Sequence, residues 1–457
     1  MALLPTRMTF LIITGLILVV PGLPGRSEQI QYPNANPDRG QRLRLFDQVW
    51  RAVNEGYHDQ KFNGVDWRSQ RLIFRPLAEM ASNRVELYQV LRRMLGTLGD
   101  AHTRIYSPEE SFDRYHPTGL TVGLTVRPVE GHATITWVEP ESEAARAGIR
   151  PGFRVLRVDG VAVEQALERI RVELVSSSTR TAFELQSYDR LLQLGTGSQV
   201  ELRYADDRDR HHTVVLNRRQ VEFQRRATHR QLSHRIGYID VTGFGQEVER
   251  DFDHAIQDLE GTRGLIIDLR NNGGGFVNSV LQIASYFFPE QTDLGEFISR
   301  DGRSTRRYTG LARINYQAPV VLLVSSRTAS GAEILAAAMQ ERQRATIIGT
   351  HGTTCGCLLG VSRTVKLVDG GRLNISDTDF RTAYGERIEG RGVKPDLTVD
   401  LRTIDLLLEK DEPLQVALDQ LGRRIIFGRQ HSRIDFSIRL PRNVIEASPN
   451  QTNLRDR

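Results

Sequence analysis

Continuous apolar runs separated by helical patterns constrain the fold most strongly, and they occupy the second half of the chain. Gly264–Asp268 is apolar up to its last residue, and Pro319–Val324 is apolar throughout. A strand pattern at Ile236–Ile239 precedes them, and helical patterns alternate with these strands at Glu247–Leu259, Val277–Phe288 and Gly331–Gln343. Strands buried on both faces and joined by helices are typical of a parallel sheet. Residues 221–405 are therefore predicted to form an α/β core.

The chain before this core changes its hydrophobic period once. Residues 28–106 carry helical spacing, with apolar side chains recurring every three or four positions from Asp38 to Leu98. Alternating apolar residues begin near Thr118, so residues 107–220 are predicted to be a β-rich module. Within it we expect a helix at Val163–Val175 and strands at Gln199–Tyr204 and His212–Leu216. Residues 406–457 are predicted to hold a final helix, Asp411–Leu421, and a polar tail.

The first 27 residues have the pattern of a secretion signal. Arg7 precedes an apolar run, Met8–Val20, which Pro21–Gly25 ends. A short positive region, an apolar stretch of this length and a breaker with small residues are typical of a cleaved leader. The run is short for a membrane-spanning helix, which needs about 20 apolar residues. We expect an exported protein, with retention of residues 1–27 as an anchor to the membrane surface as the alternative.

Composition excludes several classes of protein. Of the 457 residues, 39% are hydrophobic and 26% are charged, which is ordinary for a globular protein and unlike a collagen or a polytopic membrane chain. The net charge is only +5, and basic residues interleave with acidic ones, which argues against a dedicated nucleic-acid surface. Lysine occurs at four positions only, which restricts the choice of a catalytic base: Lys61, Lys366, Lys394 and Lys410.

Two loops follow strands of the predicted core, where the carboxyl ends of parallel strands meet. Asp268–Gly275 ends in three glycines, whose backbone N–H groups can face an anion or simply form a tight turn. In the second loop Ser330 stands where a strand gives way to a helix. This serine can cap the helix together with Glu333, or it can be a nucleophile served by the helix N-terminus.

Four segments together resemble the C-terminal processing, or tail-specific, serine peptidases. They are Leu98–Thr103, Asp268–Gly275, Thr328–Glu333 and Glu389–Asp396, in the family's order. Gly273 replaces the proline of the family's glycine loop. The resemblance implies an α/β fold with a crotonase/ClpP-like ββα core, an N-terminal helical region and an inserted β-rich PDZ domain. It also implies a serine endopeptidase without a metal or organic cofactor.

The resemblance also indicates which base to expect. Most members of the family use a serine–lysine dyad, but Cys355 stands where that lysine would be, and Lys366 lies in a strand-like run. A branch similar to the tricorn core protease uses Ser, His and Glu instead. Carried over to this sequence, that triad is Ser330, His102 and Glu389. Three alternatives remain open here: a structural role for His102, a surface position for Glu389, and Glu386 as the carboxylate.

The remaining parts of the expected site follow from the same resemblance. The backbone N–H groups of Gly331 and Gly274 would form the oxyanion hole. Val122, Gly123 and Leu124 would form the PDZ loop that receives the terminal carboxylate of a peptide. A module that only packs against the core is the alternative for this region.

Cys355 and Cys357 form a single C-x-C segment with three interpretations. Free cysteines usually pack in cores as small apolar residues, which we expect here first. A short-loop disulfide or redox control comes second. A metal site comes last, because two thiols without further Cys or His nearby are too few ligands.

The sequence thus predicts an exported serine endopeptidase that cleaves unstructured or C-terminally presented polypeptides through an acyl-enzyme. The alternative is a non-catalytic peptide- or ligand-binding protein that keeps the fold. The missing lysine favours the alternative, and the retained serine, histidine and glutamate favour the enzyme. We expect a polypeptide substrate and no nucleic-acid partner, and the sequence leaves the oligomeric state open.

Overall fold

The computed structural model describes residues 36–431, apart from residues 111–117, 175–176, 194–196, 313, 351 and 362. The predicted secretion signal at residues 1–27 and the end of the polar tail, residues 432–457, lie outside the described residues. Among the helices described, none is both long and apolar enough to cross a membrane.

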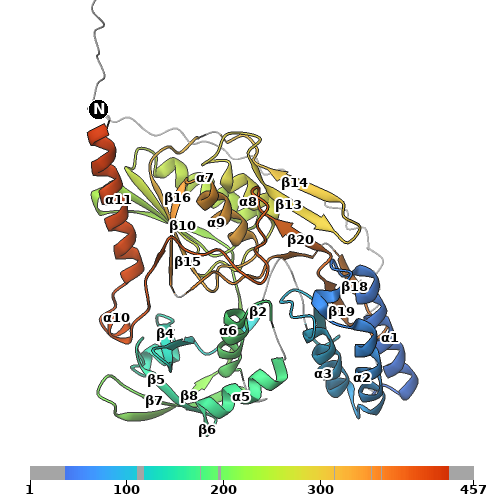
Figure 1. Cartoon of the computed structure of the whole chain (residues 1–457). Helices are drawn as coiled ribbons and strands as arrows, with labels where there is room; N and C mark the ends of the chain where they lie inside the picture. The colour runs from blue at the N-terminus through green and yellow to red at the C-terminus, as the bar shows by residue number, and fades with distance from the viewer. Residues whose placement is uncertain are drawn as a thin grey trace, which may run out of the picture. The chain divides into compact units, whose positions relative to one another are not determined.

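The core is the predicted α/β sheet (Figure 1). Its six strands lie in the order β10-β11-β12-β15-β16-β21, and every neighbouring pair is parallel except β10 with β11. The strands are Ala227–Leu232, Ile236–Val241, Gly264–Asp268, Val320–Ser325, Ala345–Thr350 and Leu397–Thr398. The pairing of Ile266 with Val321 places the ends of β12 and β15, and hence the two candidate loops, at one edge of the sheet.

Helices cover both faces of this sheet, as the unbroken apolar runs predict. Leu265, Ile267 and Leu322 point into a cluster with α7, α8 and α9. The alternate residues Ile266 and Val321 point to the opposite face, where they pack against α11. These helices span Gln246–Asp258, Val277–Ala284, Gly331–Glu341 and Glu412–His431. Strand side chains alternate between faces, so a run without polar positions suits a strand buried on both sides.

The N-terminal region is helical, as expected, but its core includes strands from far along the chain. The helices α1, α2 and α3 span Arg39–Gly56, Trp67–Met80 and Arg84–Gly96. Their buried side chains share one cluster with Leu367, Leu373 and Ile375. These three residues lie in or near a small sheet, β1-β19-β18, built from Arg104–Tyr106, Arg372–Ile375 and Arg363–Lys366. The turn that carries His102 therefore lies between α3 and a strand that pairs with the second half of the chain.

The β-rich segment has the expected strands and one helix that the sequence did not indicate. Its main sheet has the order β3-β4-β5-β7-β8, with the short β6 beside β5, so that β3 is an edge strand. These strands are Leu124–Val129, His132–Val138, Arg154–Val158, Val161–Ala162, Gln199–Ala205 and His211–Asn217. The predicted helix is α5, Val163–Leu174, and the unpredicted one is α6, Arg180–Leu191, which packs beside β3. A separate pair joins β2, Thr118–Thr121, to β9, Arg219–Glu222.

A further antiparallel sheet, β14-β13-β20-β17, was not anticipated. Its strands are Ser304–Tyr308, Asp293–Ser299, Thr378–Arg381 and Leu359–Gly360. Polar and charged residues dominate them, which hides the alternation on which strand prediction depends. The remaining short elements are η1 (Phe62–Gly64), α4 (Glu143–Arg146), η2 (Ser233–Arg235) and α10 (Thr403–Leu407).

Candidate active site

Ser330 occupies a strained turn between β15 and α9. Its φ angle is +53°, a region that residues with a side chain rarely adopt. Its N–H donates to the carbonyl oxygen of Cys357 at 3.0 Å and to Glu333 Oε2 at 3.0 Å. Strained backbone of this kind persists where its surroundings hold it in place, and it is common at active sites. The turn therefore holds a half-buried serine at the N-terminus of α9.

The glycine loop lies directly against this serine. A Cβ atom on Gly274 would lie 2.7 Å from Ser330 Cβ and 2.9 Å from the backbone nitrogen of Gly331. The two N–H groups expected for the oxyanion hole are thus neighbours, but they differ in whether they already make a hydrogen bond. The Gly274 N–H donates to Asn272 Oδ1 at 2.8 Å. Among the hydrogen bonds of the described residues, the Gly331 N–H has none, so it is the better-placed donor.

The glycine loop is anchored at its start by a buried ion pair. Arg270 binds Asp268 at 2.6 Å and Asp411 at 2.7 Å, and the hydroxyl group of Tyr238 donates to Asp268 at 2.8 Å. These two carboxylates hold the pKa of the Arg270 guanidinium well above its usual value, although burial acts in the opposite direction. Charged hydrogen bonds of this kind fix the start of the loop, four to six residues before Gly274, which lies against Ser330.

His102 lies in the turn between α3 and β1 and lines a cavity beside the serine turn. The cavity measures about 330 Å³, and its walls include Ala329, Arg104, Cys355 and Cys357. The backbone N–H of His102 donates to Asp100 at 2.6 Å. Its Nδ1 atom is buried without a hydrogen-bond partner among the described residues. Burial lowers the pKa of this histidine below its ordinary value of 6.5, with Asp100 opposing the effect, so the neutral ring is favoured near pH 7.

Glu389 is buried, whereas the competing carboxylate is on the surface. The Glu389 side chain accepts the N–H of Leu358 at 2.6 Å. Burial raises its pKa to about 8; hydrogen bonds from Ser178 and Leu358 act in the opposite direction, and Asp100 and Glu333 add to the rise. Glu386 is 70% exposed and lies 3.8 Å from Arg391. The structure thus favours Glu389 over Glu386 as a site carboxylate.

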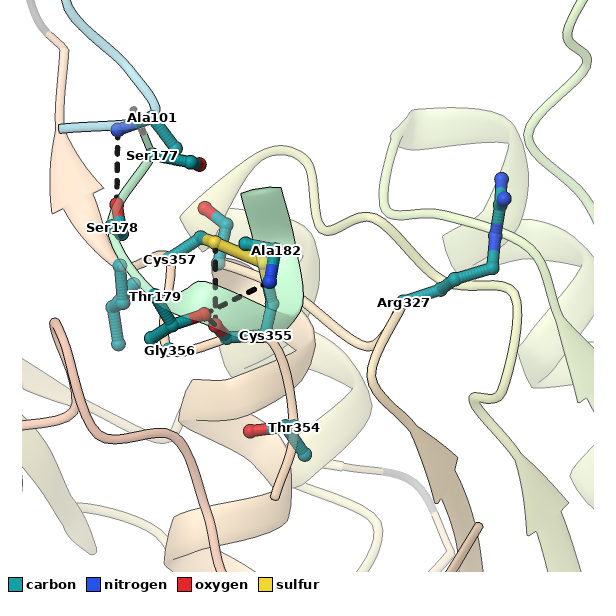
Figure 2. Close-up of a disulfide and its surroundings, with 12 residues drawn as sticks. Ala101, Ser177, Ser178, Thr179, Ala182, Arg327, Thr354, Cys355, Gly356 and Cys357 are labelled. Carbon is teal, nitrogen blue, oxygen red and sulfur yellow. Dashed lines mark hydrogen bonds between the residues drawn. A yellow bond between two sulfur atoms is a disulfide. The ribbon is translucent and has the colours of Figure 1, made fainter. Parts of the chain in front are cut away.

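The structure does not join His102 to Glu389. Among the described residues no hydrogen bond links the two side chains, and the hydroxyl group of Ser178 lies between their segments instead. Ser178 accepts the N–H of Ala101 at 2.9 Å, as Figure 2 shows, and it also bonds to Glu389. Nothing in the sequence pattern indicated Ser178, because it lies just before a helix that we did not predict.

The C-x-C segment forms a disulfide between Cys355 and Cys357. Our first interpretation, free thiols packed in a core, is therefore corrected in part. Both residues are buried and pack against Ala182, but they are bonded to each other. Lys366 is exposed on β18, and Lys61, Lys394 and Lys410 are exposed as well, so no lysine is buried at the site.

Glu333 connects this segment to the serine. It is fully buried and accepts hydrogen bonds from the N–H groups of Gly356 and Cys357 and from the hydroxyl group of Thr354, besides that from Ser330. Burial raises the pKa of Glu333 to about 7 against the lowering effect of these four donors. The sequence identified this glutamate only as half of a capping box.

The loop expected to receive a peptide carboxylate, residues 122–124, is largely buried or hydrogen-bonded within the protein. Val122 and Leu124 are buried in the core of the β-rich segment, and the Gly123 N–H donates to Thr121 at 3.0 Å. A cavity of about 300 Å³ beside Val122 is lined by residues of both charges, including Glu139, Glu143 and Arg219. The loop nevertheless leads into β3, the edge strand that α6 accompanies.

Comparisons with known proteins agree with the resemblance expected from the four segments. Residues 235–399 match Peptidase family S41, and residues 39–96 match the Tricorn protease C1 domain. A carboxyl-terminal-processing protease of Synechocystis sp. is 28% identical over 416 residues, which cover 86% of this chain and 89% of that protein. A solved photosystem II D1 C-terminal processing protease is 26% identical with a TM-score of 0.54, covering 80% of this chain and 96% of that one. Mature CPAF complexed with lactacystin shares the fold, with a TM-score of 0.67 at 15% identity over 85% of this chain and 99% of that one.

Proposed function

We propose that this chain, a serine-type peptidase with a peptidase family S41 core at residues 235–399, processes polypeptides near their C-terminus. The observation that supports this most is the position of Ser330: a serine at positive φ, at the start of a helix, in contact with a glycine loop. The names of its relatives support the substrate class. The pattern of residues 1–27 supports an exported enzyme.

Ser330 is the proposed nucleophile and His102 the proposed base. The histidine removes the serine proton as the hydroxyl attacks a peptide carbonyl, and then donates it to the departing amine. The free N–H of Gly331 stabilises the oxyanion that forms. Water then hydrolyses the acyl-enzyme by the same steps.

Glu389 is the proposed third member, and its role requires a rearrangement. Catalytic hydrogen bonds are often loose without substrate and tighten in the complex. We infer that a bound polypeptide presses the 100–103 turn against Glu389, so that the unpaired Nδ1 of His102 gains a carboxylate partner. In this arrangement Glu389 releases its proton to solvent water, since the ionised carboxylate is favoured beside a histidine that becomes a cation when it takes the serine proton.

The β-rich segment is the proposed substrate-binding module of PDZ type. Its edge strand β3 has no further strand beside it in the described sheet and can take an extended peptide as one, and α6 forms the second wall. Arg127 on β3 binds Asp189 on α6 at 2.6 Å, and Asp189 also binds Arg327 of the serine turn at 3.1 Å. A peptide that adds to β3 would therefore lie close to the Arg127–Asp189 ion pair, and Asp189 also binds the turn that bears Ser330.

The experiment uses a stable domain with an unstructured C-terminal extension as substrate, followed by mass spectrometry of the products. We expect the wild type to shorten the extension and the Ser330→Ala variant to leave it intact. Equal cleavage by both proteins would show that a different residue, or a contaminant, is responsible.

A further inference from the structure

The loop 354–358 makes direct hydrogen bonds to every expected acidic or nucleophilic group of the site. The carbonyl oxygen of Cys357 accepts the N–H of Ser330 at 3.0 Å. The N–H groups of Gly356 and Cys357 donate to Glu333 at 2.7 and 3.1 Å, and that of Leu358 donates to Glu389 at 2.6 Å. A shift of this short loop therefore moves the nucleophile and two carboxylates together.

The disulfide closes this loop and faces the cavity. Cys355 and Cys357 flank Gly356, whose φ of +66° bends the chain so that the two side chains meet. Figure 2 shows the bond beside α6, where Thr179 donates to the carbonyl oxygen of Cys355 at 2.7 Å. Both cysteines line the same cavity as His102. The sulfur atoms are thus buried within the protein but adjoin a space that a small thiol can enter.

We propose that Cys355–Cys357 is a reversible thiol–disulfide exchange site that positions Ser330. A thiolate of a dithiol reductant attacks one sulfur, which breaks the Cys355–Cys357 bond and forms a mixed disulfide. The second thiol of the reductant then displaces the protein sulfur. Two electrons and two protons pass to the cysteine pair, which ends as two thiols, while the reductant ends as a disulfide.

Reduction alters the site because hydrogen bonds hold the loop 354–358, which leaves it little freedom to absorb the separation of the two sulfur atoms. Two thiols repel at the distance of a covalent bond, so at least one cysteine must move away from the other. The residues on both sides of each cysteine bind Glu333 or Glu389, through the hydroxyl group of Thr354 or through the backbone N–H groups of Gly356 and Leu358, and these groups move with it. A displacement of about 1 Å at a catalytic group can cost about a hundredfold in rate. The oxidised form is therefore the active form, an inference that rests on the proposed peptidase activity.

The test compares the full chain before and after treatment with dithiothreitol, with protein thiols counted by a chromogenic thiol reagent. We expect reduction to yield two thiols and to lower kcat for a peptide substrate by about tenfold or more, with KM changed less than about twofold. Reoxidation should restore kcat. The Cys355→Ser/Cys357→Ser double variant should have the low kcat and no response to the reductant.

The outcomes separate this proposal from the proposed function. If the oxidised wild type shows no cleavage that depends on Ser330, the peptidase function itself is wrong, and the switch with it. If two thiols appear while kcat stays constant, or if no thiols appear after reduction under native conditions, only the exchange site is refuted. A loss of kcat that reoxidation does not reverse, accompanied by a lower melting temperature, would indicate general destabilisation and also refute it.

Discussion

Replacing Glu389 by glutamine should make the protein more stable at alkaline pH while lowering its activity. The Glu389 carboxyl is buried, and its pKa in the folded protein is about 8 against an ordinary value of 4.5. Between pH 4.5 and about 8, the folded state therefore keeps a proton that the unfolded chain has already released. Stability that depends on this group is present at low pH and is lost as the pH rises through about 8. Glutamine resembles the protonated carboxyl and removes that loss.

The size of the effect follows from the pKa difference. At about 1.4 kcal/mol per pH unit, the interval from 4.5 to about 8 sets an upper bound of roughly 5 kcal/mol on the stability lost by the wild type. Even a third of this bound would separate the melting temperatures of variant and wild type by about 3–7 °C at pH 8.5, for a domain of 150–250 residues.

Thermal unfolding of the wild type and Glu389→Gln at pH 5, 6.5 and 8.5 measures this difference. We expect nearly equal melting temperatures at pH 5 and a gap that widens toward pH 8.5. Glu386→Gln is the matched control, because Glu386 is 70% exposed, and it should follow the wild type at every pH. A wild type that becomes more stable from pH 5 to 8.5, with no gap to Glu389→Gln, would refute the assignment of Glu389 as a buried, protonated group.

Three further predictions concern the catalytic groups. Burial lowers the pKa of His102, so protonation of this residue should add a loss of kcat/KM below about pH 6.5, and His102→Ala should lose both this limb and nearly all turnover; an unchanged limb in the variant would exclude His102 as the base. Gly274→Ala should lower kcat by about a hundredfold, because its Cβ would lie 2.7 Å from Ser330 Cβ at a φ of +95°. Gly273→Ala is the control, with no atom within 4 Å of the new Cβ, and its kcat should stay within about twofold of the wild type. Equal effects of the two substitutions would contradict the contact between Gly274 and Ser330. Ser178→Ala should raise the pKa of Glu389 and lower kcat by about tenfold, while Ser177→Ala, which removes a bond from Gln186, should not; a silent Ser178→Ala would remove Ser178 from the site.

The sequence predicted the central sheet well because burial leaves a direct trace in composition. Gly264–Asp268 appears in the structure with the predicted bounds, and β15 begins one residue after the predicted start. The predicted helix Val277–Phe288 ends early, at Ala284, because the apolar residues beyond it pack in a turn rather than in a helix. Apolar spacing reports burial, and it does not distinguish the last turn of a helix from a buried loop.

The site was harder to predict because it depends on contacts between distant segments. The glycine loop, the serine turn and Glu389 were each indicated by local patterns or by resemblance. The link from Ala101 through Ser178 to Glu389 joins segments of the chain that are far apart in sequence. The disulfide was only the second choice for the C-x-C segment, because spacing alone cannot distinguish a bonded pair from two thiols.

The nucleophile can be identified most directly by covalent labelling. A fluorophosphonate probe reacts preferentially with an activated serine, and peptide mapping by mass spectrometry locates the modified residue. The account predicts one labelled serine, Ser330, with labelling abolished in Ser330→Ala and strongly slowed in His102→Ala. Labelling at any other serine, or equal labelling rates for His102→Ala and the wild type, would contradict it.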